Sequence, residues 1–251
     1  MNYIYWHTDR IGVLTNLINA ENHSHWMLQL FLSLDGLIEI DVAGKKLNGS
    51  CIIVGKNISH SIDAKQKTIF TMLIAPTSAI ATAIEPHINS CGYWLCDTGN
   101  LTAVQSEAQK LVLSNSIEQY FIFLQKLNKY LNINPAAKPF DPRISMLLQL
   151  IENCNCDDHT ISSYAHQISL SASRLSHLFK TEVGIPLKSY IMLHQVECAF
   201  EAYLNGKSIT QAALDAGFDS SSHFSATVKR IMGMPASLSA KDSEFLKVKE
   251  V

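Results

Sequence analysis

One helical pattern occurs twice in the C-terminal half of the chain. The first copy is TISSYAHQISLSASRLSHLFKTEVG, residues 160–184, and the second is SITQAALDAGFDSSSHFSATVKRIMG, residues 208–233. In each copy a short amphipathic segment ends at a turn, and a second amphipathic segment follows and ends at a glycine. The stretch between them, PLKSYIMLHQVECAFEAYL, keeps a helical period throughout. The sequence therefore predicts two helix-turn-helix motifs joined by one long helix at about residues 187–204.

The second helix of each motif has one apolar side and one side of small or polar groups. Leu175 and Phe179 in the first copy, like Phe224 and Val228 in the second, are four residues apart, as on a buried helix face. We expect the other sides to face DNA bases through Ser173, Arg174, Ser176, His177, Ser221, Ser222, Ser225 and Ala226. We expect phosphate contacts from Lys180, Ser220, His223 and Lys229. A lone helix of this kind is more often a solvated surface, but two of them suit two major-groove contacts about 34 Å apart.

Composition limits the class of protein but does not decide whether these helix faces are solvated surfaces or contact DNA. The formal net charge is −2, and residues 160–240 hold six Lys and Arg against five Asp and Glu, which predicts modest electrostatic affinity for DNA. Six cysteines without a repeated Cys-x-x-Cys spacing argue against a zinc ribbon. The sequence MNYIYWHTDR does not resemble a signal peptide, and the apolar runs are shorter than the roughly 20 residues of a membrane span. We therefore expect a soluble, cytoplasmic protein that has no membrane partner.

The N-terminal half is predicted to be a separate, β-rich domain. Short runs such as LIEIDV, SCIIVG and TIFTMLIA alternate with turn residues, which is typical of a small antiparallel sheet structure. Apolar residues at helical spacing predict two helices between about residues 101 and 131. The segment NINPAAKPFDPR holds three prolines and is the best linker candidate. The expected fold class is two-domain α+β, with residues 1–134 as the first domain, 135–143 as the linker and 144–251 as an all-α domain.

The C-terminal half resembles the AraC/XylS family of bacterial transcription regulators. The resemblance covers roughly Ile161 to Ser237 and rests on SRLSHLFKTEVGIPLKSYI, on Ala199 in the connecting helix and on the second copy of the helical pattern, in that order. Gln195 stands where the family usually has an arginine, and Val228 replaces a common phenylalanine. The resemblance implies a regulator, more often an activator than a repressor, that binds double-stranded DNA, works with RNA polymerase and forms a homodimer.

The segments HSHWMLQLFLSLDG and GSCIIVGKNISH resemble the two motifs of cupin domains. This resemblance implies a cupin-like antiparallel β-barrel over residues 1–76, with glutamine where metal-binding cupins usually have glutamate. Strand alternation allows the histidines to share one interior. Three alternatives stay open for them. His23, His25, Gln29 and His60 form a pocket for a small organic effector, or His23, His25 and His60 bind a divalent metal, or the histidines are structural.

The helices between residues 101 and 131 resemble the dimerisation element of the family. Leu111, Phe121 and Leu124 are the expected contacts with a second copy, and packing within the same chain is the alternative. No nucleophile or acid–base pair accompanies the histidines, so we do not expect an enzyme. Two other functions stay open beside the regulator: a metal-binding cupin sensor, and a protein-interaction module with a degenerate DNA-binding surface.

Overall fold

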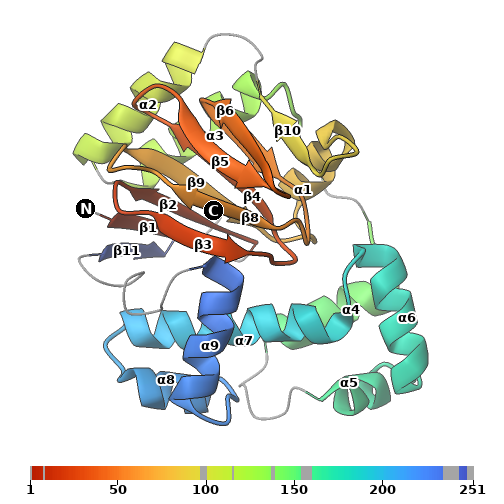
Figure 1. Cartoon of the computed structure of the whole chain (residues 1–251). Coiled ribbons are helices and arrows are strands. Elements are labelled where there is room, and N and C mark those ends of the chain that lie inside the picture. Colours follow the sequence, from red (N-terminus) through yellow and green to blue (C-terminus); the bar gives the residue numbers. More distant parts are fainter. Residues whose placement is uncertain are drawn as a thin grey trace. The chain divides into compact units, whose positions relative to one another are not determined.

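The computed structural model describes residues 2–7, 9–96, 101–114, 116–136, 139–153, 160–233 and 243–247. It divides into two compact units, one formed by Met1–Ala137 together with Arg230–Val251 and the other by Lys138–Lys229. The first unit combines β-sheets with helices, whereas the second is helical (Figure 1). The two-domain α+β prediction is confirmed. No helix in the described part of the chain is long and apolar enough to cross a membrane.

The strands of the first unit form two sheets. The seven-stranded sheet has the order β10 (Tyr93–Leu95), β7 (Cys51–Val54), β4 (Leu28–Ser33), β9 (Ile69–Ile74), β2 (Arg10–Thr15), β1 (Asn2–His7) and β11 (Ser243–Lys247). The four-stranded sheet has the order β3 (Asn19–His23), β8 (His60–Asp63), β5 (Ile38–Val42) and β6 (Lys45–Gly49). Neighbouring strands are antiparallel, except that β1 and β11 run parallel. Strand β11 therefore lies beside β1 although the two are far apart in sequence.

The seven-stranded sheet is covered on both faces. Strands β4 and β9 are buried along their whole length. Leu28, Leu30 and Leu32 belong to a core shared with the helices, while Phe31 belongs to a second core shared with the four-stranded sheet. The antiparallel β-rich domain predicted over residues 1–76 does not close into a barrel, because the described strands form two separate sheets. Alternate residues of β4 need apolar cover on opposite faces, and a helix layer supplies it on one of them.

The helices of the first unit pack on one face of its larger sheet (Figure 1). They are α1 (Ala79–Ile84), the 3-10 helix η1 (Glu85–His87), α2 (Leu101–Ser114) and α3 (Ile117–Tyr130). Ser116 is the N-cap of helix α3, and its Oγ accepts a hydrogen bond from the N–H of Gln119 at 3.1 Å. Its Tyr120 ring stacks on Tyr5 of β1 with 4.4 Å between centroids. Helices α2 and α3 are the predicted pair; α2 buries Val104, Ala108 and Leu111, and α3 buries Tyr120, Phe123, Leu124 and Leu127.

The second unit contains both helix-turn-helix motifs. Its helices are α4 (Pro142–Glu152), α5 (Ile161–Gln167), α6 (Ala172–Val183), α7 (Leu187–Leu204), α8 (Ile209–Asp215) and α9 (Ser221–Met232). Side chains that accept backbone N–H groups cap five of them, at Asp141, Thr160, Ser171, Ser208 and Ser220. Gly184 ends α6 with φ 82°, a left-handed conformation that favours glycine. The predicted arrangement of two motifs joined by one long helix, α7, is confirmed.

Helix α4 begins inside the predicted linker. Asp141 is its N-cap and accepts a hydrogen bond from the N–H of Arg143 at 2.9 Å. Pro142 occupies the first turn, where a missing N–H costs nothing because that group has no partner within the helix. The third proline of the segment therefore lies in the first turn of a helix.

Candidate nucleic-acid interface and histidine cluster

Helix α6 presents a row of exposed polar side chains. Its buried side consists of Leu175, Phe179 and Val183. The opposite side exposes Ser173, Arg174, His177 and Lys180 and leaves Ser176 half-buried. Ser176 Oγ donates to the carbonyl oxygen of Ala172 at 2.8 Å, so this hydroxyl is held by its own helix. The other four side chains project outward and are the ones that can reach a ligand.

Helix α9 has the same division into a buried and an exposed side. Phe224 and Val228 are fully buried, and the Phe224 ring packs against Phe200 of α7 with centroids 5.6 Å apart. Ser220, Ser222, His223, Ala226 and Lys229 are exposed. The side chains of Ser221 and Ser225 are half-buried, which reduces the surface that they offer to a base edge.

The start of α9 carries a cap and an acidic neighbour. Ser220 Oγ accepts a hydrogen bond from the N–H of His223 at 3.1 Å, so it caps the helix. The carboxylate of Asp219 is 93% exposed and lies 3.3 Å from Nδ1 of His223. A negative charge there stabilises the helix dipole but opposes the approach of a phosphate group. This end of α9 is thus less suited to phosphate than the sequence alone indicated.

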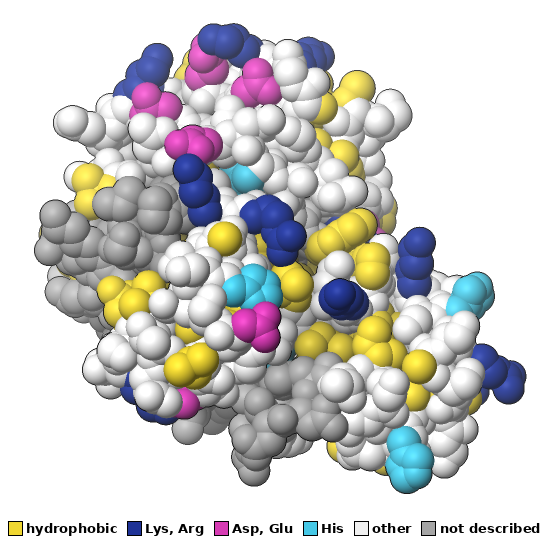
Figure 2. Space-filling model, turned by 60° about the horizontal axis from the view of Figure 1, so that its bottom comes forward, with side chains coloured by type: hydrophobic (Ala, Val, Ile, Leu, Met, Phe, Trp, Pro, Cys, Tyr) yellow, Lys and Arg dark blue, Asp and Glu magenta, His cyan; other side chains and the backbone are white. Residues whose placement is uncertain are grey.

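Basic side chains are spread thinly over the surface. In the second motif the Lys207 ammonium group pairs with Asp215 at 2.6 Å. On the face drawn in Figure 2, the described Lys and Arg side chains lie singly or in small groups, and several lie beside Asp or Glu. This spread favours recognition through polar contacts over attraction by one strong basic patch.

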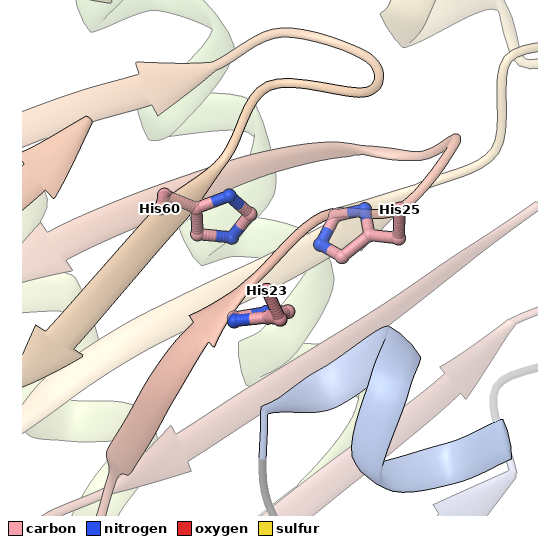
Figure 3. Close-up of side chains that lie close together, drawn as sticks. All are labelled: His23, His25 and His60. Atoms are coloured by element: carbon pink, nitrogen blue, oxygen red, sulfur yellow. The ribbon is translucent and has the colours of Figure 1, made fainter. Parts of the chain in front are cut away.

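Four polar side chains meet in the first unit, and we refer to them as the histidine cluster: His23, His25, His60 and Gln29. His23 ends β3, His60 begins β8 opposite it, Gln29 belongs to β4, and His25 lies in the β3–β4 connection. All four are buried. The rings of His23 and His60 have centroids 4.3 Å apart, and the ring of His25 lies 5.2 Å from that of His60 (Figure 3). One ligand atom from each histidine lies within 4.8 Å of the other two.

The histidine rings are oriented by the backbone. Each Nδ1 hydrogen-bonds to a carbonyl oxygen, that of His23 to Glu21 at 2.8 Å, of His25 to Met27 at 3.0 Å and of His60 to Ile58 at 2.8 Å. In each ring the main chain therefore fixes the Nδ1 edge, and the Nε2 edge faces other groups. For His25 and His60 that partner is Oε1 of Gln29, at 3.0 Å from each Nε2.

Burial keeps the cluster neutral. Burial lowers the pKa of His25 to about 4 and that of His60 to about 3. Burial also lowers the pKa of His23. Removal from water disfavours the charged imidazolium, and neighbouring histidines add to the effect when any one of them is protonated. Neutral imidazoles are good ligands for transition metals and good hydrogen-bonding groups for an organic molecule.

Sequence reasoning missed the residues that orient this cluster. Thr71 of β9 accepts a hydrogen bond from Nε2 of Gln29 at 3.1 Å and donates to the carbonyl oxygen of Leu30 at 2.9 Å. Thr71 lies opposite Phe31 in the β4–β9 register, a pairing that its sequence position does not reveal. The partners of Nδ1 are backbone carbonyl oxygens, which every residue type has, so the sequence gives no signal for them.

Two of the three residues expected at a dimer contact lie inside the first unit. Leu111 is fully buried and Leu124 is 5% exposed, and both belong to the core between the helices and the seven-stranded sheet. Phe121 is half-buried and packs against the same core. Their apolar surface is used within the chain, which supports the alternative that the sequence left open.

Comparisons with known proteins point to the same two units. Residues 164–239 match a family described as "Helix-turn-helix domain". The chain is 28% identical over 134 residues to the virulence regulon transcriptional activator VirF of Yersinia enterocolitica, across 53% of this chain and 46% of VirF. It is 29% identical over 166 residues to the arabinose operon regulatory protein of Salmonella typhimurium, across 65% of this chain and 54% of that protein. The chain spans about half the length of the curated relatives it matches.

Solved structures of one protein share the fold over nearly the whole chain. Apo ToxT from Vibrio cholerae matches with a TM-score of 0.60 and 13% identity, across 92% of this chain and 97% of ToxT. ToxT with a bound unsaturated fatty acid matches with a TM-score of 0.56 and 14% identity, across 92% and 95%. At these identities the likeness shows a common fold. Residues 164–239 thus carry a helix-turn-helix domain, and the chain is similar in sequence to two transcription regulators.

Proposed function

We propose that the chain is a transcription regulator that reads DNA with α6 and α9. The observation that carries this proposal is the exposed polar side on the second helix of each helix-turn-helix motif. In such motifs the second helix enters the major groove. Because α6 and α9 carry different outward side chains, the target is an asymmetric site. The regulatory names of the two sequence relatives support this function.

The exposed residues divide into two proposed roles. Arg174 and His177, one turn apart on α6, have donors that can reach base edges, and arginine pairs best with guanine. Lys180 and Lys229 are proposed to contact phosphates, which fixes the register of each helix on DNA without reading sequence. Ser173, Ser222 and Ala226 are exposed and small, so they allow close approach of the helices to bases.

Control of the DNA-binding unit is proposed to come from the first unit. VirF is a transcriptional activator, and we propose activation with RNA polymerase as the partner here. ToxT has been solved with a fatty acid bound, which supports a small ligand as one form of control. A homodimer would raise the affinity for DNA, because linking two weakly basic DNA-binding units makes binding of the second unit an intramolecular step. Because Leu111 and Leu124 are buried in the core, the contacts between two copies of the chain must come from exposed residues such as Leu113, which is 86% exposed.

The proposal is tested by selecting bound duplexes from a random DNA library with the full-length chain at two salt concentrations. We expect one asymmetric sequence to be enriched, more strongly at low salt. The matched control is the double variant Arg174→Ala/His177→Ala, which removes two exposed side chains and should keep the fold while losing the enriched sequence in one half. If a folded wild-type chain enriches nothing at either salt, the protein-interaction module becomes the better function.

A further inference from the structure

Two cysteines face each other at one edge of the seven-stranded sheet. Cys51 is the first residue of β7, and Cys96 follows directly after β10. The antiparallel register of these strands pairs Ile52 with Leu95, so the next opposite pair is Cys51 with Cys96. The N–H of Cys96 donates to the carbonyl oxygen of Cys51 at 3.0 Å, which continues the strand pairing to this position.

The side chains of the two cysteines lie on the same face of the sheet. Directly opposite residues of an antiparallel pair point to one side. Both cysteines belong to the core between this sheet and the helices, with exposed fractions of 1% for Cys51 and 5% for Cys96. Their side chains hydrogen-bond to each other, and this contact together with burial raises the pKa of the Cys96 thiol. The fold thus brings two free thiols together from distant parts of the sequence.

The spacing of this pair suits a disulfide that can be opened again. Opposite residues of a hydrogen-bonded antiparallel pair have Cα atoms about 5.5 Å apart, within the range of about 4.4–6.8 Å found for disulfides. Their Cβ atoms lie about 4.5–5.5 Å apart, whereas a relaxed disulfide holds them at about 3.5–4.5 Å. The strands must therefore draw together to form the bond, and a disulfide under such strain is more easily reduced.

We infer that Cys51 and Cys96 form a reversible disulfide bond by exchange with a small disulfide such as oxidised glutathione. One protein thiolate attacks a sulfur atom of the small disulfide, which gives a mixed disulfide and releases one small thiolate. The second protein thiolate attacks the cysteine sulfur of the mixed disulfide, closes the Cys51–Cys96 bond and releases the second small thiolate. Two protein thiols are oxidised, one small disulfide is reduced to two thiols, and the protons of the protein thiols pass to the released thiolates.

Strand β10 provides a way for the reagent to reach the buried thiols. Exchange needs a thiolate that is exposed to solvent, and burial opposes both conditions. Strand β10 has only three residues and lies at the edge of its sheet, so it can open without disruption of the central strands. Its last residue, Leu95, is already 40% exposed. Local opening of this edge would uncover Cys96, and the pair would therefore respond slowly to a lasting change in redox state.

The disulfide would fasten the sheet edge at a point that the helix layer also holds. Tyr130, the last residue of α3, donates its hydroxyl hydrogen to the carbonyl oxygen of Cys96 at 2.6 Å. Oxidation would therefore join β7 covalently to the residue that links β10 with the end of α3. This inference does not depend on the proposed DNA-binding function.

The test uses the full-length chain with the exposed Cys91 replaced, as Cys91→Ser. This parent variant is held in mixtures of oxidised and reduced glutathione until the cross-linked share stops changing, and free thiols are then blocked with an alkylating agent. Trypsin releases residues 47–56 and 68–110, each with one cysteine in this variant, so a bond between them in mass spectrometry identifies Cys51 with Cys96. We expect at least about half of the folded chain to be cross-linked in the most oxidising mixture, and the bond to be lost when reduced glutathione is in excess.

The matched control is Cys198→Ser in the same parent, because Cys198 lies on α7 in the second unit. It should cross-link like the parent, whereas Cys96→Ser should give no bond between the two peptides. In urea the parent should form this bond at least about tenfold less, since only the fold raises the effective concentration of one thiol at the other.

Three results would overturn the inference. The first is a parent chain that is folded by circular dichroism yet stays less than about a tenth cross-linked in the most oxidising mixture. The second is an equal cross-linked share in urea, and the third is a bond that excess reduced glutathione does not open. DNA selection is a separate measurement, so failure of either proposal leaves the other standing.

Discussion

His23 and His60 face each other across the antiparallel strands β3 and β8, and each ring bonds to the carbonyl oxygen of the residue two positions before it. The pair is thus set by strand register, which puts two imidazoles with the same fixed Nδ1 edge side by side. Their centroids are 4.3 Å apart because the strands themselves are neighbours. Strand pairing alone therefore brings together two of the residues expected to line a ligand pocket.

Thr71 is predicted to position Gln29 within the histidine cluster. Thr71→Val keeps the shape of the side chain but removes the hydroxyl that bonds to the amide of Gln29 and to the carbonyl oxygen of Leu30. Buried polar groups then lose a partner, so we expect the free energy of unfolding to fall by about 1–3 kcal/mol. Urea unfolding followed by circular dichroism measures the change. Thr82→Val is the control, since the Thr82 hydroxyl bonds to the carbonyl oxygen of Ser78 beside its own helix, and an equal loss in both variants would contradict the role of Thr71.

Arg174 and Lys180 are predicted to act differently on DNA. Arg174→Ala should relax the sequence preference in one half of the site, with a cost of about 1–3 kcal/mol on the preferred sequence only. Lys180→Ala should weaken all sequences alike and reduce the dependence of affinity on salt. Competition binding against matched and mismatched duplexes at several salt concentrations separates the two effects. Identical changes on every duplex would show that the assignment of roles is wrong.

The helical half of the fold could be predicted because its signals are local. The turn at Gly217, the cap at Ser171 and the four-residue spacing of Phe224 and Val228 each lie within one or two helical turns. The helical period also predicted which residues face outward, and Arg174, one of these residues, is exposed in the structure. Half-burial of Ser221 and Ser225 depends on how α9 packs on its neighbours, so spacing alone could not give it.

The β-rich half was harder to predict because its pairings are long-range. The grouping of His23 with His60 could be expected from strand alternation, but the two-sheet arrangement depends on helices that cover β4. Pairing of β1 with β11 joins segments at opposite ends of the sequence and has no local signal. Thr71 was missed for the same reason, since only the β4–β9 register brings it beside Gln29.

Strand β11 is predicted to protect the edge of the seven-stranded sheet. It pairs in parallel with β1 from Asn2 to Trp6, so its removal would leave the outer edge of β1 without a partner among the described strands. An open edge with free N–H and C=O groups promotes pairing with other chains. Deletion of residues 243–251 should therefore increase self-association in sedimentation velocity experiments. Deletion of residues 248–251 is the control, and equal behaviour of the two truncations would show that β11 does not protect this edge.

Leu124 and Leu113 are predicted to separate core packing from dimerisation. Leu124 is 5% exposed, whereas Leu113 is 86% exposed. Leu124→Ala should lower the free energy of unfolding by about 2–5 kcal/mol, because it removes buried methyl groups and leaves a cavity. Leu113→Ala should change it by less than about 0.5 kcal/mol, as is usual for an exposed side chain. Urea unfolding followed by circular dichroism measures both.

The same two positions test where a second copy would bind. If α2 contributes to a homodimer, Leu113→Glu should lower the dimer fraction in sedimentation experiments while leaving unfolding of the chain unchanged, because a charge on an exposed position opposes an apolar contact without disturbing the core. Leu124→Ala would reduce the dimer fraction only through loss of folded protein. A wild-type dimer that survives Leu113→Glu at every protein concentration would place the contact elsewhere on the chain and would contradict a role for this face of α2.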